Sequence, residues 1–211
     1  MKLKFCGFRQ LSDVKKAKDL DIDAMGFIHF PKSKRFVDIQ KIRQFTDVIP
    51  DDKEKVVILV NPDYDVIDNL IEETGITSMQ LHGEEPLSTI SYIRQKSKDI
   101  KIIKALPAKD SESLLTAIEY YKHVVDQFII DTPSQNYGGT GKVYDWEILK
   151  VVNDIDYLLA GGINYENIQK IEKLSLQHSG YDIASGIETN NDKDKDKCKM
   201  QSIIELVKGA N

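Results

Sequence analysis

Short apolar runs alternate with amphipathic segments along the whole chain. Between the runs, apolar residues recur every three or four positions, as in Leu11, Val14 and Ala17, which is the spacing of one face of a helix. The alternation therefore predicts repeated strand–helix units. The apolar runs expected to form strands are residues 3–6, 24–28, 56–60, 78–81, 100–105, 128–131, 157–160 and 181–184.

Eight strand–helix units favour a closed barrel, because a sheet of eight parallel strands tends to close on itself. We therefore predict an α/β fold, a single (β/α)8 TIM barrel formed by residues 1–211 without an internal linker. An open doubly wound sheet is the alternative, since it also alternates strands and helices. The residues expected to cap or stop helices are Ser12, Asp38, Asp63, Asn164 and Gly75.

Composition and charge exclude several classes of protein. A net charge of −5 and a pI near 5.5 argue against a nucleic-acid surface, which needs clustered Lys and Arg. No apolar run approaches the length of a membrane span or a secretory signal, so we expect a cytoplasmic protein. Cys6 and Cys198 match neither a disulfide framework nor metal-ligand spacing. The charged segment 190–199 is expected to be a solvated loop and helix start.

Candidate chemistry gathers where the predicted strands end. In a barrel, the carboxyl ends of all strands face one shared site. Cys6, His82 and Asp131 each end a strand, and glycine pairs follow the last two strands. The loop at 132–142 after Asp131 is longer than most connections, and its glycines Gly138, Gly139 and Gly141 suggest a cover over a ligand.

Six motifs along the chain resemble those of the phosphoribosylanthranilate isomerase family, in the same order. The resemblance implies an Amadori rearrangement of N-(5-phosphoribosyl)anthranilate in tryptophan biosynthesis, with no cofactor and no metal. Ala184 stands where the family often has a second serine. The motifs are KFCGF at 4–8, FPKSKRF at 30–36, QLHGEE at 80–85, DTPSQNYGGTGKVYDW at 131–146, AGGINYEN at 160–167 and ASGIE at 184–188.

The same resemblance implies a role for each site residue. Cys6 is expected to be the base, Asp131 the acid and Arg35 the ligand of the substrate carboxylate, which a guanidinium binds through two hydrogen bonds. His82 is expected near the substrate, and Asp182 at a ribose hydroxyl. The expected phosphate loops contain Gly161, Gly162, Ser185 and Gly186. The implied partner is a phosphorylated small molecule, bound by a monomer or a homodimer.

Both catalytic residues need a particular environment. A free thiol has a pKa of about 8.5, so a base at Cys6 needs a nearby cation or helix N-terminus that lowers this pKa. Lys4 lies on the same face of the predicted strand and is one candidate cation. A free Asp has a pKa of about 3.9, so an acid at Asp131 needs apolar, desolvated surroundings.

The residues alone leave other interpretations open. Cys6 could be a small buried hydrophobic residue, Asp131 a turn former and Arg35 a solvated cation. A different sugar-phosphate barrel, such as indoleglycerol phosphate synthase or the histidine-pathway isomerase, is an alternative function, although those relatives lack the KFCGF motif. A non-catalytic barrel that binds a phosphorylated ligand is another alternative.

Overall fold

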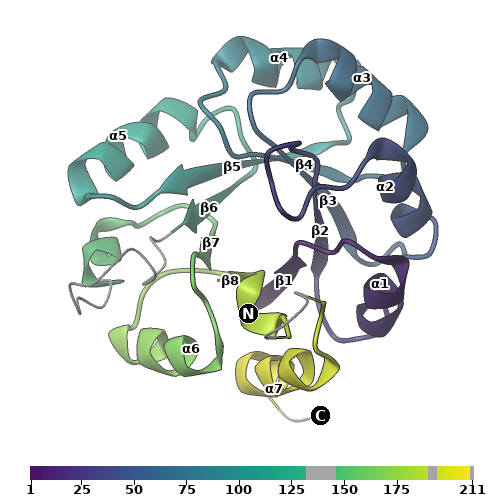
Figure 1. The fold of residues 1–211 in the computed structure, drawn as a ribbon. Helices are drawn as coiled ribbons and strands as arrows, with labels where there is room; N and C mark the ends of the chain where they lie inside the picture. Colours follow the sequence, from purple (N-terminus) through teal and green to yellow (C-terminus); the bar gives the residue numbers. More distant parts are fainter. Residues whose placement is uncertain (132–145, 190–193, 210–211) are drawn as a thin grey trace.

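Eight parallel strands close into a barrel in the computed structural model of the protein, which describes residues 1–131, 146–189 and 194–209. Each strand pairs with the next along the chain, and the last strand pairs with the first (Figure 1). The predicted barrel is confirmed, and the open sheet is excluded. The strands are β1 (Lys2–Cys6), β2 (Ala24–Ile28), β3 (Glu54–Leu59), β4 (Ser78–Leu81), β5 (Lys101–Pro107), β6 (Gln127–Asp131), β7 (Tyr157–Ala160) and β8 (Gly180–Ile183).

A ring of helices surrounds the strands (Figure 1). The segment that begins at Trp146 was expected to be an α-helix and is instead the 3₁₀-helix η1 (Trp146–Val151). The remaining helices are α1 (Leu11–Ala17), α2 (Ile39–Thr46), α3 (Tyr64–Glu73), α4 (Leu87–Lys96), α5 (Ser111–Tyr121), α6 (Tyr165–Ile171), η2 (Glu172–Leu174), η3 (Ser185–Ile187) and α7 (Lys197–Lys208).

The side chains of each strand alternate between two apolar layers, as the pleat of a strand requires. Outward-facing residues such as Phe5 and Phe27 pack beneath the helices. Inward-facing residues fill the barrel itself, so its interior is a packed core. The inner layer consists of Cys6, Ala24, Val56, Ile58, Ile103, Ala105, Ile129, Leu158 and Ala160.

The structure confirms some of the predicted helix caps and contradicts one. Asp38 and Asn164 cap α2 and α6, since their side chains accept hydrogen bonds from the backbone N–H groups three residues later. Asp63 stands at the N-cap of α3 but makes no side-chain bond there. The prediction for Ser12 is wrong, because α1 begins earlier and Gln10 holds the cap position.

Polar side chains cross-link the N-terminal end of the barrel. Lys101 Nζ donates to Glu54 Oε1 at 2.7 Å and to Gln127 Oε1 at 3.0 Å. Gln127 Nε2 in turn donates to Asp156 Oδ2 at 2.9 Å. This network ties strand starts together, while the residues with candidate chemistry lie at the opposite end of the strands.

Candidate active site

Cys6 ends β1 with its side chain inside the barrel, 6% exposed. Lys4 lies on the same face, as predicted, and its Nζ is 2.8 Å from Asp182 Oδ1 on the neighbouring strand β8. The thiol also packs closely against β2, because a Cβ added at Gly26 would lie 2.8 Å from Cys6 Sγ. A glycine at position 26 therefore makes room for the thiol.

Burial dominates the titration of this thiol. Burial raises the pKa of Cys6, and the ammonium groups of Lys4 and Lys195 oppose that rise without reversing it. The sequence predicted the nearby cation correctly, but the expected lowering of the pKa of Cys6 is wrong, because this pKa is raised. The enclosed position inside the barrel outweighs the nearby positive charges.

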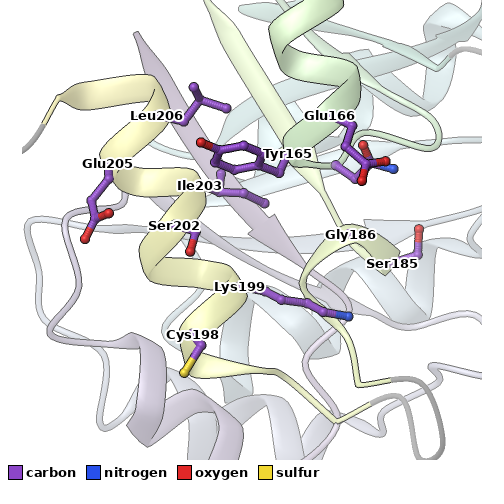
Figure 2. A pocket seen from close by; sticks show the side chains of 11 residues that line it. Tyr165, Glu166, Ser185, Gly186, Cys198, Lys199, Ser202, Ile203, Glu205 and Leu206 are labelled. Atoms are coloured by element: carbon purple, nitrogen blue, oxygen red, sulfur yellow. The ribbon is translucent and has the colours of Figure 1, made fainter.

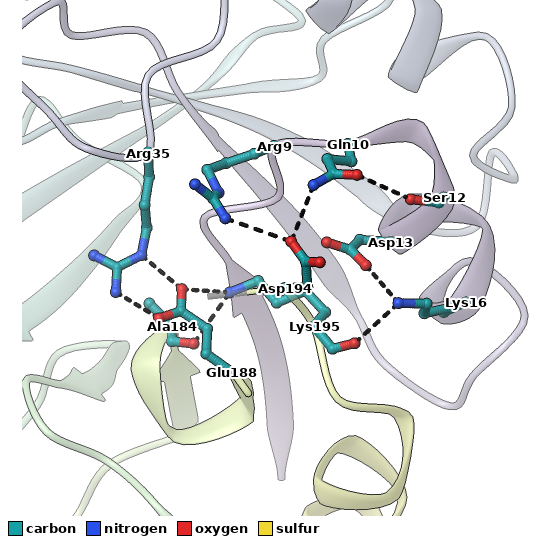
Figure 3. Close-up of polar contacts among 10 residues, drawn as sticks. All are labelled: Arg9, Gln10, Ser12, Asp13, Lys16, Arg35, Ala184, Glu188, Asp194 and Lys195. Carbon is teal, nitrogen blue, oxygen red and sulfur yellow. Dashed lines mark hydrogen bonds and ion pairs between the residues drawn. The ribbon is translucent and has the colours of Figure 1, made fainter. Parts of the chain in front are cut away.

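Arg35 reaches the same end of the barrel from the loop after β2. Its Nε donates to Glu188 Oε1 at 2.6 Å and its Nη2 to Glu188 Oε2 at 2.8 Å (Figure 3). Glu188 follows η3 and is buried. Arg35 is therefore not the solvated loop cation of the alternative interpretation, since a buried carboxylate fixes its guanidinium group.

Lys195 completes this cluster and was not expected from the sequence. Its Nζ is 3.2 Å from Glu188 Oε1 and 3.1 Å from the carbonyl oxygen of Ala184. The side chain is fully buried, which corrects the prediction that the whole charged segment at 190–199 is solvated. Burial lowers the pKa of Lys195, and the negative charge of Glu188 counteracts that shift.

Asp131 ends β6, where its carboxylate lies beside an imidazole. His82 Nε2 is 3.3 Å from Asp131 Oδ2, and Gln80 Nε2 is 3.3 Å from the other ring nitrogen of His82. The side chain of Asp131 is 36% exposed. The expected apolar surroundings are therefore not found among the described residues, although His82 does lie at the predicted site.

Glu85, the last residue of the QLHGEE motif, stabilises the loop after β4. Glu85 is buried and accepts hydrogen bonds from the backbone N–H groups of Asn61 and Gly83, and from Lys104 Nζ at 2.9 Å. Burial alone would raise the pKa of Glu85, but the Lys104 ammonium and the backbone N–H groups outweigh it and hold the pKa below its ordinary value. Glu85 thus fixes the loop that carries His82.

The loops after β7 and β8 touch each other. Gly161 and Gly162 have φ angles of +84° and +64°, which glycine adopts readily. The carbonyl oxygen of Gly162 accepts a hydrogen bond from Asn167 Nδ2 at 2.8 Å. A Cβ added at Gly186 would lie 2.1 Å from the carbonyl oxygen of Ile163, so the backbones of the two loops are in close contact.

Asp182 pairs with Lys4 across the neighbouring strands β8 and β1. Its register partner on β1 is Lys4, two residues before Cys6, so Asp182 lies one layer below the thiol. Its carboxylate is buried against the Lys4 ammonium. Asp182 therefore fixes the position of this cation.

The predicted cover and a groove near the phosphate loops also concern this end of the barrel. The expected cover at 132–142, with Gly138, Gly139 and Gly141, lies outside the described residues.

Figure 2 shows a groove between α6 and α7 that reaches Ser185 and Gly186 and also includes the exposed Cys198. In the described ranges, no three His, Cys, Asp or Glu side chains form a group that could hold a metal ion. None of the helices in these ranges has the length and hydropathy of a membrane-spanning segment.

The sequence is similar to those of known isomerases over nearly its full length. The family model described as N-(5'phosphoribosyl)anthranilate (PRA) isomerase matches residues 3–205. An N-(5'-phosphoribosyl)anthranilate isomerase of Staphylococcus aureus (strain Mu3) is 51% identical over 209 residues, which cover 99% of this chain and 98% of the relative.

Solved structures agree with the sequence match. The phosphoribosyl anthranilate isomerase of Thermotoga maritima has a TM-score of 0.86 and 28% identity, covering 100% of both chains. A second structure, of such an isomerase in complex with reduced 1-(o-carboxyphenylamino)-1-deoxyribulose 5-phosphate, has a TM-score of 0.84 and 25% identity, again covering 100% of both chains. Both resemble the present barrel from end to end.

Proposed function

The chain belongs to the N-(5'-phosphoribosyl)anthranilate isomerase family, and from this membership we propose how its residues divide the work of the reaction. The protein is an isomerase of tryptophan biosynthesis that converts N-(5'-phosphoribosyl)anthranilate into 1-(2-carboxyphenylamino)-1-deoxyribulose 5-phosphate. The family match sets aside the other sugar-phosphate barrels and the non-catalytic barrel. The order of the strands is the observation that carries the assignment of roles.

The substrate phosphate would be held between the acid and the base. In the closed barrel, β7 and β8 lie between β6, which ends at Asp131, and β1, which ends at Cys6. We propose that the backbone N–H groups of the touching loops at Gly161–Gly162 and Ser185–Gly186 bind this phosphate, as loops after the seventh and eighth strands of such barrels often do. A sugar anchored there would extend toward both reactive side chains.

Asp131 acts as the acid in the first step of this proposal. Its protonated carboxyl group donates a proton to the ring oxygen of the ribose as the bond from that oxygen to C1 breaks. The anthranilate nitrogen supplies the electron pair that forms the C1–N double bond of the Schiff base. Asp131 is left as a carboxylate beside His82 Nε2, 3.3 Å away, and His82 would orient it.

Cys6 acts as the base in the second step. Its thiolate removes the proton from C2, and the electrons of that C–H bond form the C1–C2 double bond of an enolamine while the electron pair of the C1–N double bond returns to the nitrogen. The enolamine becomes the ketone when C1 gains a proton and the C2 hydroxyl loses one. Lys4 and Lys195 support the thiolate form, because their positive charges oppose the effect of burial on the pKa of Cys6.

Arg35 binds the carboxylate of the anthranilate ring in this account. A guanidinium group can form two parallel hydrogen bonds to a carboxylate, which fixes the ring as well as holding it. The contact of Asp182 with a ribose hydroxyl stays a prediction. In the structure, the carboxylate of Asp182 pairs with Lys4.

Partners and location remain part of the proposal. We infer a cytoplasmic enzyme, because both cysteines are free thiols, as is usual in a reducing compartment. We expect no nucleic-acid partner, given the net charge of −5. A monomer and a homodimer both fit the chain, and one relative from Thermotoga maritima was solved as monomers generated from a dimeric isomerase.

Loss of substrate fluorescence tests the function. Freshly prepared phosphoribosylanthranilate should lose its fluorescence on addition of the pure protein, at a rate proportional to protein concentration. The protein should also restore growth of a tryptophan auxotroph that lacks this isomerase. Saturable binding of the substrate without product would overturn the proposed catalysis.

A further inference from the structure

The guanidinium group of Arg35 uses only one of its two donor edges within the protein contacts described. The edge formed by Nε and Nη2 faces Glu188, with bonds of 2.6 and 2.8 Å. A guanidinium group has a second edge, formed by Nη1 and the other N–H of Nη2, with the same fork geometry. Binding of Glu188 therefore leaves Arg35 able to receive a second carboxylate.

Glu188 is placed to hold Arg35 rather than to meet solvent. Its side chain is 5% exposed, whereas that of Arg35 is 23% exposed. Burial would raise the pKa of Glu188, but the hydrogen bonds from Arg35 and the charge of Lys195 outweigh it and lower the pKa. Glu188 is therefore ionised at neutral pH and binds Arg35 as a full negative charge.

Backbone pairing fixes Lys195 against Glu188. The two residues form an isolated antiparallel bridge, so their side chains lie next to each other. Thr189 N donates to the carbonyl oxygen of Asp194 at 2.8 Å, and Asp196 N donates to that of Ile187 at 2.8 Å. Lys195 Nζ is thus fixed near the carboxylate, 3.2 Å from Oε1.

Contacts from α1 and from the two residues before it hold this segment in place (Figure 3). Gln10 Nε2 donates to Asp194 Oδ1 at 3.0 Å, and Lys16 Nζ donates to the carbonyl oxygen of Lys195 at 3.3 Å. Arg9 Nη2 also reaches Asp194 Oδ1, at 3.5 Å. Groups far apart in the sequence therefore build one rigid support under Arg35.

We propose that Glu188 and Lys195 are positioning residues that hold the guanidinium group of Arg35 with its free edge toward the aromatic carboxylate of the substrate. This proposal rests on the carboxylate-binding role of Arg35 given above. Glu188 supplies the orientation. Lys195 offsets the negative charge of Glu188, which would otherwise repel the incoming carboxylate.

The charges around the pair are consistent with this role. Lys4 and Asp182 neutralise each other on the adjoining strands β1 and β8. Arg35 and Lys195 together face the single carboxylate of Glu188, which leaves one positive charge in excess. An aromatic carboxylate of the substrate would balance that excess. Glu188 without Lys195 would leave no excess positive charge.

Paired inhibitors test the proposal. One is the reduced product analogue, and the other is the same molecule with hydrogen in place of the ring carboxylate. Glu188→Gln should weaken binding of the first inhibitor about tenfold, the size expected for a lost hydrogen bond to a charged group, and change binding of the second less than about twofold. A merely structural role would weaken both alike, and an unchanged inhibition constant for the first would also contradict the proposal.

A second variant and a control variant complete the test. Lys195→Met should likewise weaken only the carboxylated inhibitor, which keeps the test decisive if Glu188→Gln does not fold. Glu119→Gln, which removes the charge that pairs Glu119 of α5 with Lys122 at the end of that helix, should affect neither inhibitor. If the wild-type protein binds both inhibitors equally, the role of Arg35 itself is wrong. If it prefers the carboxylated inhibitor and both variants keep that preference, only the positioning role is wrong.

Discussion

The stem of Arg35 crosses directly over the backbone of Gly7: a Cβ added at Gly7 would lie 2.7 Å from Arg35 Cδ. Gly7 also has a φ angle of +80°, in the region that side chains disfavour. The glycine of the KFCGF motif therefore follows Cys6 for a physical reason. It leaves the space through which Arg35 reaches Glu188.

Gly7→Ala should displace Arg35 and weaken substrate binding. We expect KM to rise about tenfold, because the guanidinium group loses its bonds to Glu188, and stability to fall by about 1–2 kcal/mol from the strained φ angle. Steady-state kinetics and urea denaturation measure the two effects. Gly75→Ala is the control, since its Cβ would lie 3.5 Å from Thr46, an ordinary contact. A normal KM in Gly7→Ala would contradict this reading of the motif.

The thiol of Cys6 should titrate at an alkaline pH. Because burial raises its pKa, we expect iodoacetamide to react with Cys6 at half its maximal rate above the value of about 8.5 for a free thiol. Cys198→Ser provides the background, since Cys198 is exposed. Lys4→Met should shift the midpoint further upward, because the opposing positive charge is lost. A midpoint near pH 7 would contradict the dominance of burial.

The pH dependence of turnover follows from the same thiol. A base must be unprotonated in the free enzyme, so kcat/KM should rise from neutral pH toward the raised pKa of Cys6. Stopped assays between pH 5 and 10 measure the profile, and a kcat/KM that does not rise above neutral pH would contradict the role of Cys6 as the base.

Lys104 and Glu85 form a buried ion pair whose loss should destabilise the barrel. Lys104→Met leaves the Glu85 carboxylate without its cation, which should cost about 3–5 kcal/mol. The pKa of Glu85 is lowered in the folded protein, so its contribution to stability is present above the unfolded value of about 4.3 and is lost as the pH falls through the folded value. Urea denaturation at pH 7 and pH 4 measures both effects. Equal stability of the variant and the wild type at pH 7 would contradict this assignment.

Much of the fold could be predicted because it depends on local patterns. The spacing of apolar residues located the strands, and the closing of the sheet followed from their number. The sixth helical segment differs because a face of Trp146 and Leu149 does not distinguish an α-helix from a 3₁₀-helix. The cap at Gln10 was missed because Ser12 is the better cap by residue type.

The candidate site was harder to predict where it depends on distant contacts. The motifs identified Cys6, Asp131 and Arg35, but Lys195 carries no local signal in a segment rich in Lys and Asp. Its burial results from the bridge to Glu188, a contact that the neighbouring sequence does not signal. Glu188 itself ends the ASGIE motif, which was a signal that the sequence offered.

The central claim is that a thiol on β1 and a carboxyl on β6 act on one anchored sugar. Cys6→Ser and Asp131→Asn should each lower kcat at least about 100-fold, because general acid and base catalysis contribute that much or more. The inhibition constant of the reduced product analogue, measured in the same preparations, should change less than about threefold. Wild-type turnover in either variant would contradict the claim.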